Sequence, residues 1–172
     1  MKNLKIGKKL LVTFGAVTAL FAISIAVMFY SLNTTSESYT YQVDKVLPVS
    51  NQLNTMRRNI QAGAKFVMYA ITSPNDKEGY MEEAQTCLDA LQEGLDFLRE
   101  NSTIDPAILD GFFSNMDSSV AYKEEVFRLI AAGETDAALN LYFDKYYPVL
   151  VKANEYLLEA HDYVDQRSEL VQ

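Results

Sequence analysis

An uncharged run of 23 residues, Leu10 to Leu32, sets the strongest limit on how this chain can fold. A membrane-spanning helix needs about 20 predominantly apolar residues, so the run predicts one membrane span. Four lysines precede the run, and residues 1–32 contain no acid: Lys2, Lys5, Lys8 and Lys9. By the positive-inside rule, this asymmetry places the N-terminus, residues 1–9, in the cytoplasm.

A cleavable signal peptide is the alternative interpretation of the same run. Its apolar core would be shorter, about 7–15 residues, and a small-x-small cleavage site would follow. The stretch AVMFYSL at the end of the run has no such pattern. We therefore expect a retained transmembrane helix over 10–32 and an extracytoplasmic domain over 33–172, in the plasma (inner) membrane of a bacterium.

The charge of the expected outer domain argues against several classes of function. Residues 33–172 carry 11 Lys/Arg against all 23 Asp/Glu, a net charge of -12, which disfavours binding to nucleic acid. The single cysteine, Cys87, lies in an apolar helical pattern and is expected to be a small buried hydrophobe. The single histidine, His161, is expected on a helix surface. No metal-ligand spacing, phosphate loop or catalytic motif is present, so we expect no enzyme activity, metal or cofactor.

Breaks in the sequence divide the outer domain into four helical segments, about 35–72, 76–100, 105–131 and 135–172. The breaks are TSPND at 72–76, NSTIDP at 101–106 and AAGET at 131–135. Asp105 and Pro106 suit the N-cap and the first position of a helix. Gly133 suits a helix C-terminus, and Thr135 suits the cap of the next helix. The apolar pattern of the last segment continues to the end, so we expect the natural protein to continue beyond it.

Apolar residues in these segments recur at spacings of three and four. The first segment gives Val46, Val49, Leu53, Met56, Ile60, Gly63, Val67 and Ala70, and the third is looser, with polar residues at 123 and 124. Such seams mark helices that pack against one another, and short connections make neighbouring helices antiparallel. The prediction is an all-α, antiparallel up-down-up-down four-helix bundle. Pro48 inside the first segment predicts a kink or a restart of the helix.

A basic stretch on the first segment is the candidate for function. From Lys45 to Asn75 there is no Asp or Glu, yet Arg57, Arg58 and Lys65 are present. The heptad phase set by Leu53 and Ile60 directs all three away from the core of the bundle. The breaks at 72–76 and 131–135 would form the two tip turns, which lie together at one end of the bundle. Counting residues from these tip turns sets both arginines level with Tyr146 and Tyr147.

Two interpretations of this basic stretch stay open. Arginine beside tyrosine can bind a carboxylate with two hydrogen bonds, which predicts an organic-anion site. Alternatively, the arginines pair with carboxylates of a dimer partner or face water. The tyrosines could equally be packing residues.

Three stretches resemble one bacterial input module in their order and spacing: MKNLKIGKKLLVTFG, LPVSNQLNTMRRNI and AAGETDAALNLYFDKYYPVLVKANEYLLEA. The chain is similar, over nearly its whole length, to the four-helix-bundle ligand-binding domain of methyl-accepting chemotaxis proteins. The resemblance implies a homodimeric receptor that binds a small ligand between subunits. Its fourth helix would continue through a second membrane span to the chemotaxis kinase and adaptor, and binding would shift that helix along its axis.

Only some of the family's ligand-binding residues have a match in this chain. Arg58 matches the first ligand-binding arginine of the aspartate- and serine-sensing members, but the later arginines would fall near Gly63 and Val67. Lys65 is a shifted substitute. The family's Pro-Thr pair aligns with Pro148 and Val149, and valine cannot make the hydrogen bond of the threonine. An organic anion, an amino acid or a periplasmic binding protein are therefore all possible partners.

Two alternatives to a chemoreceptor remain. The same input module occurs on sensor histidine kinases and diguanylate cyclases, and the sequence after Gln172 would decide between them. A membrane-anchored helical scaffold or adaptor without a small ligand is a different class. A second hydrophobic span followed by a heptad-rich region would argue against that class.

Overall fold

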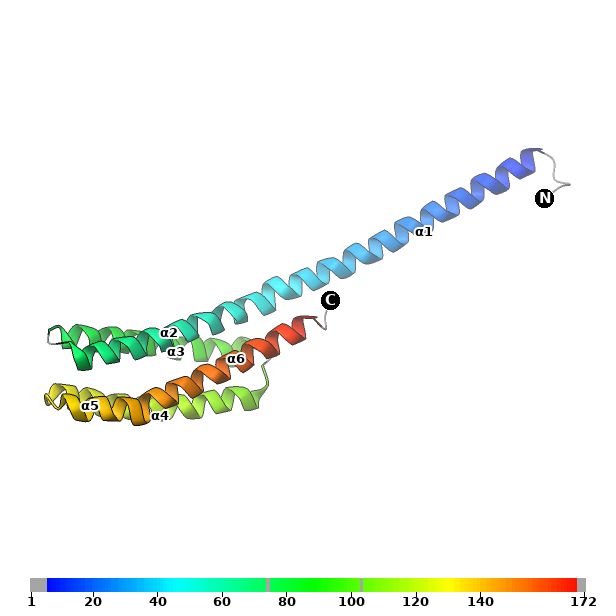
Figure 1. Cartoon of the computed structure of the whole chain (residues 1–172). Helices are drawn as coiled ribbons and strands as arrows, with labels where there is room; N and C mark the ends of the chain where they lie inside the picture. The colour runs from blue at the N-terminus through cyan, green and yellow to red at the C-terminus, as the bar shows by residue number, and fades with distance from the viewer. Residues whose placement is uncertain (1–5, 74, 103, 170–172) are drawn as a thin grey trace.

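The computed structural model describes residues 6–73, 75–102 and 104–169, and these form helices with short connections (Figure 1). The first long helix comprises α1 (Ile6–Tyr41), the π-helical turn η1 (Gln42–Val46) and α2 (Leu47–Thr72). Next come α3 (Lys77–Asn101) and α4 (Pro106–Ala131). The last long helix comprises α5 (Thr135–Leu141), the π-helical turn η2 (Tyr142–Tyr146) and α6 (Tyr147–Glu169). The predicted all-α bundle is confirmed.

Helix α1 leaves the bundle and extends alone (Figure 1). None of its residues is buried, and it is apolar and long enough to cross a membrane. Large apolar side chains such as Phe14 and Phe21 are 75% and 67% exposed. An apolar helix with no protein around it is what a membrane span requires, because lipid then covers its side chains.

Within the bundle the helices pack as two close pairs. Helix α2 packs most closely on α3, and α4 packs on α6, while α2 and α6 join the pairs. The residues of the predicted first seam from Val49 to Ala70 are buried. Close approach between α2 and α3 depends on glycine, because a Cβ atom at Gly94 would come within 2.7 Å of Met56 Cγ.

The predicted roles of Asp105 and Gly133 at helix ends are confirmed, and that of Thr135 is wrong. Asp105 Oδ1 accepts a hydrogen bond of 2.9 Å from the Ala107 N–H, which caps α4, and Pro106 follows it. Gly133 has φ 75°, the left-handed conformation that favours glycine after a helix. Thr135, however, is the first helical residue rather than a cap, and Glu134 precedes it without a capping side-chain bond.

The two π turns share one sequence pattern, Asp-Lys-x-x-Pro-Val, at residues 44–49 and 144–149. The Leu47 N–H donates to the Gln42 carbonyl, and the Tyr147 N–H donates to the Tyr142 carbonyl, five residues back in each case. The prolines that follow lack an N–H, so the usual bond to the carbonyl four residues back is absent. At Pro48 the first helix therefore continues through a π turn, where the sequence predicted a kink or a restart.

The spacing of buried residues explains why the last helix needs its π turn. Ala138, Tyr142, Tyr146 and Leu150 are all buried and follow one another at intervals of four. A regular seam alternates three and four, so repeated fours drift around an α-helix. A π turn holds more residues per turn and keeps these four side chains on the side that faces the core.

Candidate functional site

The three basic residues of the predicted site do not share one environment. Arg57 is half-buried, and its Nε donates a 3.3 Å hydrogen bond to Asn154 Oδ1 of α6. Arg57 therefore joins two helices of one bundle, where the sequence placed it facing away from the core. Arg58 is exposed on the outer face of α2, as its heptad position indicates. Lys65 is also exposed, with Nζ 5.3 Å from the centre of the Tyr69 ring.

The two predicted tyrosines lie on adjacent faces of helix 4, the helix formed by α5, η2 and α6. Tyr146 is inside the bundle, with 1% of its surface exposed. Tyr147 is 44% exposed and stacks on Tyr142, with ring centres 5.8 Å apart. Of the pair, Tyr147 alone lies at the surface, beside α2.

The predicted level of the arginines is wrong by about two helical turns. Arg57 bonds to Asn154, and Ala64 and Tyr147 meet across one groove, so the arginine lies seven residues of α6 away from Tyr147. The prediction assumed two straight α-helices counted from tip turns at one height. The turn η2 accounts for about one of these residues, because a π turn holds about one extra residue for the same axial rise. The rest of the difference shows that counting from the tip turns does not give the register of the two helices.

A shallow groove of about 130 Å³ runs between α2 and α6 and is lined by uncharged residues. Its lining comprises Ile60, Gln61, Ala64, Tyr147, Leu150, Val151 and Asn154. Arg57 holds Asn154 in place at one end of the groove, and Lys65 follows Ala64 on the neighbouring face of α2. The groove therefore combines an apolar floor, two amides and one phenol, with cations at its margins.

Sequence reasoning missed Gln61 and Asn154, although both had a signal. Gln61 lies within the acid-free stretch, between Arg58 and Lys65, and is exposed on the same helix. Asn154 is one residue after Ala153 on the seam of the last helix, a position that flanks the core. Both side chains are uncharged, and the sequence prediction rested on charged and aromatic residues.

The tyrosines behind the groove are buried, and burial raises their pKa values. Tyr142 donates a 3.1 Å hydrogen bond to the Ala64 carbonyl, and burial, with Tyr147 nearby, raises the pKa of Tyr142 to about 12. Burial also raises the pKa of Tyr146, with Tyr142 and Cys87 adding to the effect. Cys87 itself is half-buried, and burial and Glu83 raise the pKa of its thiol. These groups are neutral packing residues at physiological pH.

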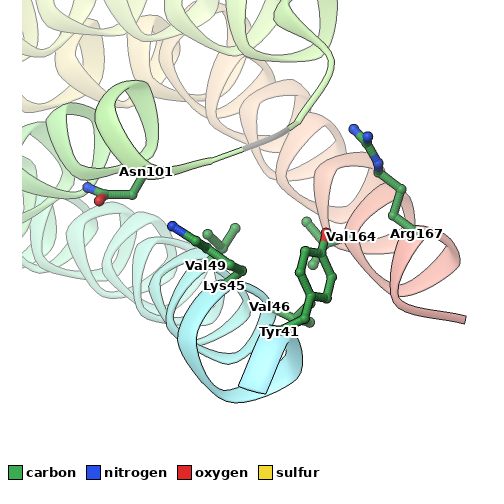
Figure 2. A pocket seen from close by; sticks show the side chains of 7 residues that line it. All are labelled: Tyr41, Lys45, Val46, Val49, Asn101, Val164 and Arg167. Atoms are coloured by element: carbon green, nitrogen blue, oxygen red, sulfur yellow. The ribbon is translucent and has the colours of Figure 1, made fainter. Parts of the chain in front are cut away.

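A second hollow lies where helix 1 (α1, η1 and α2) meets the ends of α3 and α6 (Figure 2). Its volume of about 10 Å³ has room for about one water molecule. Figure 2 shows Lys45 and Arg167 on opposite sides of it, so the two cations do not converge on one point. This hollow is too small for an organic ligand.

His161, predicted on a helix surface, is half-buried and contacts two side chains. Its Nε2 is 3.0 Å from Ser50 Oγ of α2, and its Nδ1 is 3.2 Å from Asp165 Oδ2. It therefore links helix 1 to helix 4. Among the described residues, no group of three or more His, Cys, Asp or Glu could hold a metal ion.

Comparison with known proteins gives one match. A family model described as a four-helix bundle sensory module for signal transduction matches residues 3–172. This confirms the resemblance found in the sequence, over almost the whole chain. Searches of curated proteins and of solved structures gave no match.

Proposed function

Because the chain belongs to the four-helix-bundle sensory modules for signal transduction, we propose that it is the input half of a transmembrane chemoreceptor. The module is sensory and not a catalytic family. Helix α1 would anchor it in a bacterial plasma membrane, with the bundle outside the cytoplasm. Helix α6 would lead back towards the membrane and the signalling region.

The proposed stimulus is a small organic anion with an apolar body, bound in the groove between α2 and α6. The carrying observation is the composition of this groove and its margins. Ile60, Leu150 and Val151 offer apolar contact, and Arg57 supplies a cation at one end. No carboxylate lies on α2 to compete for that charge. Helix α2 continues directly from α1, so a ligand there touches the helix that leads into the membrane.

We further propose that a second copy of the chain completes the site. The outer face of helix 4 carries the exposed apolar residues Phe143, Tyr147, Val151 and Leu158, from 39% to 56% exposed. A partner would cover them and the shallow groove. Arg58 and Lys65 would then contact the anion from one subunit or the other, and Tyr146 would support Tyr147 from within the core.

Ligand binding is tested on the 172-residue chain in detergent micelles, by its thermal unfolding with a panel of amino acids and carboxylic acids. At least one organic anion is expected to raise the midpoint, because a ligand that binds the folded state stabilises it. The rise should be lost in Arg58→Ala. The matched control is Arg128→Ala, which removes an exposed arginine of α4 that pairs with Glu125.

A shift that survives in Arg58→Ala, or one that disappears in Arg128→Ala as well, would contradict the location of the site. If no compound of the panel changes the midpoint, direct binding is wrong. A periplasmic binding protein would then be the partner to test, by measuring its association with the same chain.

A further inference from the structure

The turn η2 is tied to the groove at both of its ends. Tyr147, which follows the turn, lines the groove. Tyr142, which begins the turn, donates to the carbonyl of Ala64, and Ala64 lines the groove from α2. The Tyr147 N–H in turn donates to the Tyr142 carbonyl, the bond that closes the π turn. A change in the contacts of Tyr147 therefore acts directly on this bond.

Two features make the helix compliant at this point. Pro148 cannot donate to the carbonyl of Asp144, so one helical bond is missing where the turn ends. The turn also holds a residue more than an α-helical turn of similar rise. Exchanging the π bond for an α bond would lengthen the helix by roughly one residue, about 1.5 Å. Helix shifts of about 1–2 Å are typical of allosteric transitions.

The two sides of the turn are held differently. On the tip side, α5 packs on α4, and Ala138 of α5 is fully buried. On the other side, α6 packs on α4 and α2 and runs towards the membrane end of the bundle (Figure 1). The start of α5 is also tied to the end of α4, because the Glu134 N–H donates to the Leu129 carbonyl, whereas the far end of α6 lies at the open end of the bundle. We therefore expect a change of length in η2 to displace α6 rather than α5.

We propose that η2 is the joint through which the contents of the α2–α6 groove set the axial position of α6. The proposal rests on the proposed function, since it takes this groove as the ligand site. The π turn changes its length and so moves α6, and the whole of helix 4 does not move as a rigid body. Pro148 and Tyr142 are positioning residues of this joint.

The test fills the groove with a side chain and follows α6, so it needs no identified ligand. Gln61→Trp places an indole in the groove beside Tyr147. In a Cys87→Ala background, spin labels at Glu93→Cys of α3 and at the exposed Glu159→Cys of α6 report the position of α6. Labels at Glu93→Cys and Glu124→Cys of α4 form a reference pair that does not include α6. The labelled chain is diluted with unlabelled chain.

We expect Gln61→Trp to shift the Glu93–Glu159 distance by up to about 1.5 Å, the component of the axial displacement along the line between the labels, and to leave the reference distance unchanged. Deleting Asp144 together with Pro148→Ala should abolish the shift. That deletion leaves Ala138, Tyr142, Tyr146, Leu150 and Ala153 at intervals of four, three, four and three, a regular seam for an uninterrupted α-helix. Pro148→Ala alone should reduce the shift. If the deletion variant loses the helical circular dichroism signal and is therefore unfolded, Pro148→Ala is the variant that tests the proposal.

Pro48→Ala is the matched control, because it makes the same change at η1, away from the groove, and should leave the shift intact. The proposal is overturned if Gln61→Trp causes no shift, if the shift survives in the regular helix, or if Pro48→Ala abolishes it equally. Anion binding is measured separately by thermal unfolding. Binding without any movement of α6 contradicts the joint alone, and movement without anion binding contradicts the proposed ligand alone.

Discussion

The inner and outer sides of the α2–α6 pair differ sharply, although they are formed by adjacent residues. Ile60 and Tyr146 point into the core and are 4% and 1% exposed. The next residues in the chain, Gln61 and Tyr147, lie at the surface and line the groove. The inner side has the close packing that stabilises a fold. The outer side keeps an aromatic ring and amides partly uncovered, which costs stability and is typical of a surface that binds something.

The largest expected difference between the two sides is in stability. Leu53 of the inner side is fully buried, and Leu53→Ala should lower the free energy of unfolding by about 2–5 kcal/mol because it leaves a cavity. Arg58→Ala on the outer side should change it by less than about 0.5 kcal/mol. Urea unfolding followed by near-ultraviolet circular dichroism of the tyrosines measures both. Equal losses in the two variants would show that the outer side is packed against a partner.

High pH should destabilise the bundle through the inner side. The pKa of Tyr142 is about 12 in the fold, above the ordinary value of 10, so the folded state keeps a proton that the unfolded chain loses. Stability from this group is complete below pH 10 and is lost as the pH rises from 10 towards 12. Tyr146 acts in the same direction. The unfolding midpoint should therefore fall with pH across this range.

Replacing both inner tyrosines by phenylalanine should flatten this dependence, whereas Tyr147→Phe on the outer side should not. The measurement is the urea midpoint at several pH values above 9. An unchanged slope in the double variant would assign the alkaline instability to other groups.

The smallest expected difference compares two glycines on the α2–α3 contact. Gly63→Ala should stabilise the protein by up to about 1 kcal/mol, since alanine favours a helix. Its Cβ would lie 3.4 Å from Cys87 Cβ, an ordinary contact. Gly94→Ala places a Cβ against Gln52 and the buried Met56, and overpacking should give a net loss of about 1 kcal/mol. Thermal unfolding of the two variants should give shifts of opposite sign.

The regular parts of the fold could be predicted because one rule generates them. Seams with alternating three and four spacings identified the helices, and Asp105, Pro106 and Gly133 marked their ends. The turn η2 was missed because it appears in the seam only as extra fours, at Tyr142, Tyr146 and Leu150, and η1 leaves no mark on its seam. The repeated pattern Asp-Lys-x-x-Pro-Val was the signal that could have found them.

The candidate site could be predicted only in part, because contacts between helices depend on their relative register. The acid-free stretch lies on α2, which forms one wall of the groove, and Tyr147 lines the other wall. The register could not be obtained by counting from the tips, since it is set by side-chain contacts between helices, and η2 shifts it by about one further residue. Lys123 is a similar case. The sequence placed it in a loose seam, but its Nζ donates to Gln85 Oε1 at 2.8 Å and its side chain is buried.

Helix 1 continues without interruption from Ile6 to Thr72, a length of 67 residues or about 100 Å. The turn η1 keeps α1 and α2 in one helical path, but Pro48 removes a helical hydrogen bond there, as Pro148 does at η2. A rotation of the apolar segment would therefore first twist η1 and reach the groove wall that carries Gln61 with a smaller angle. The apolar segment and the groove are thus joined by a compliant turn and not by a rigid rod.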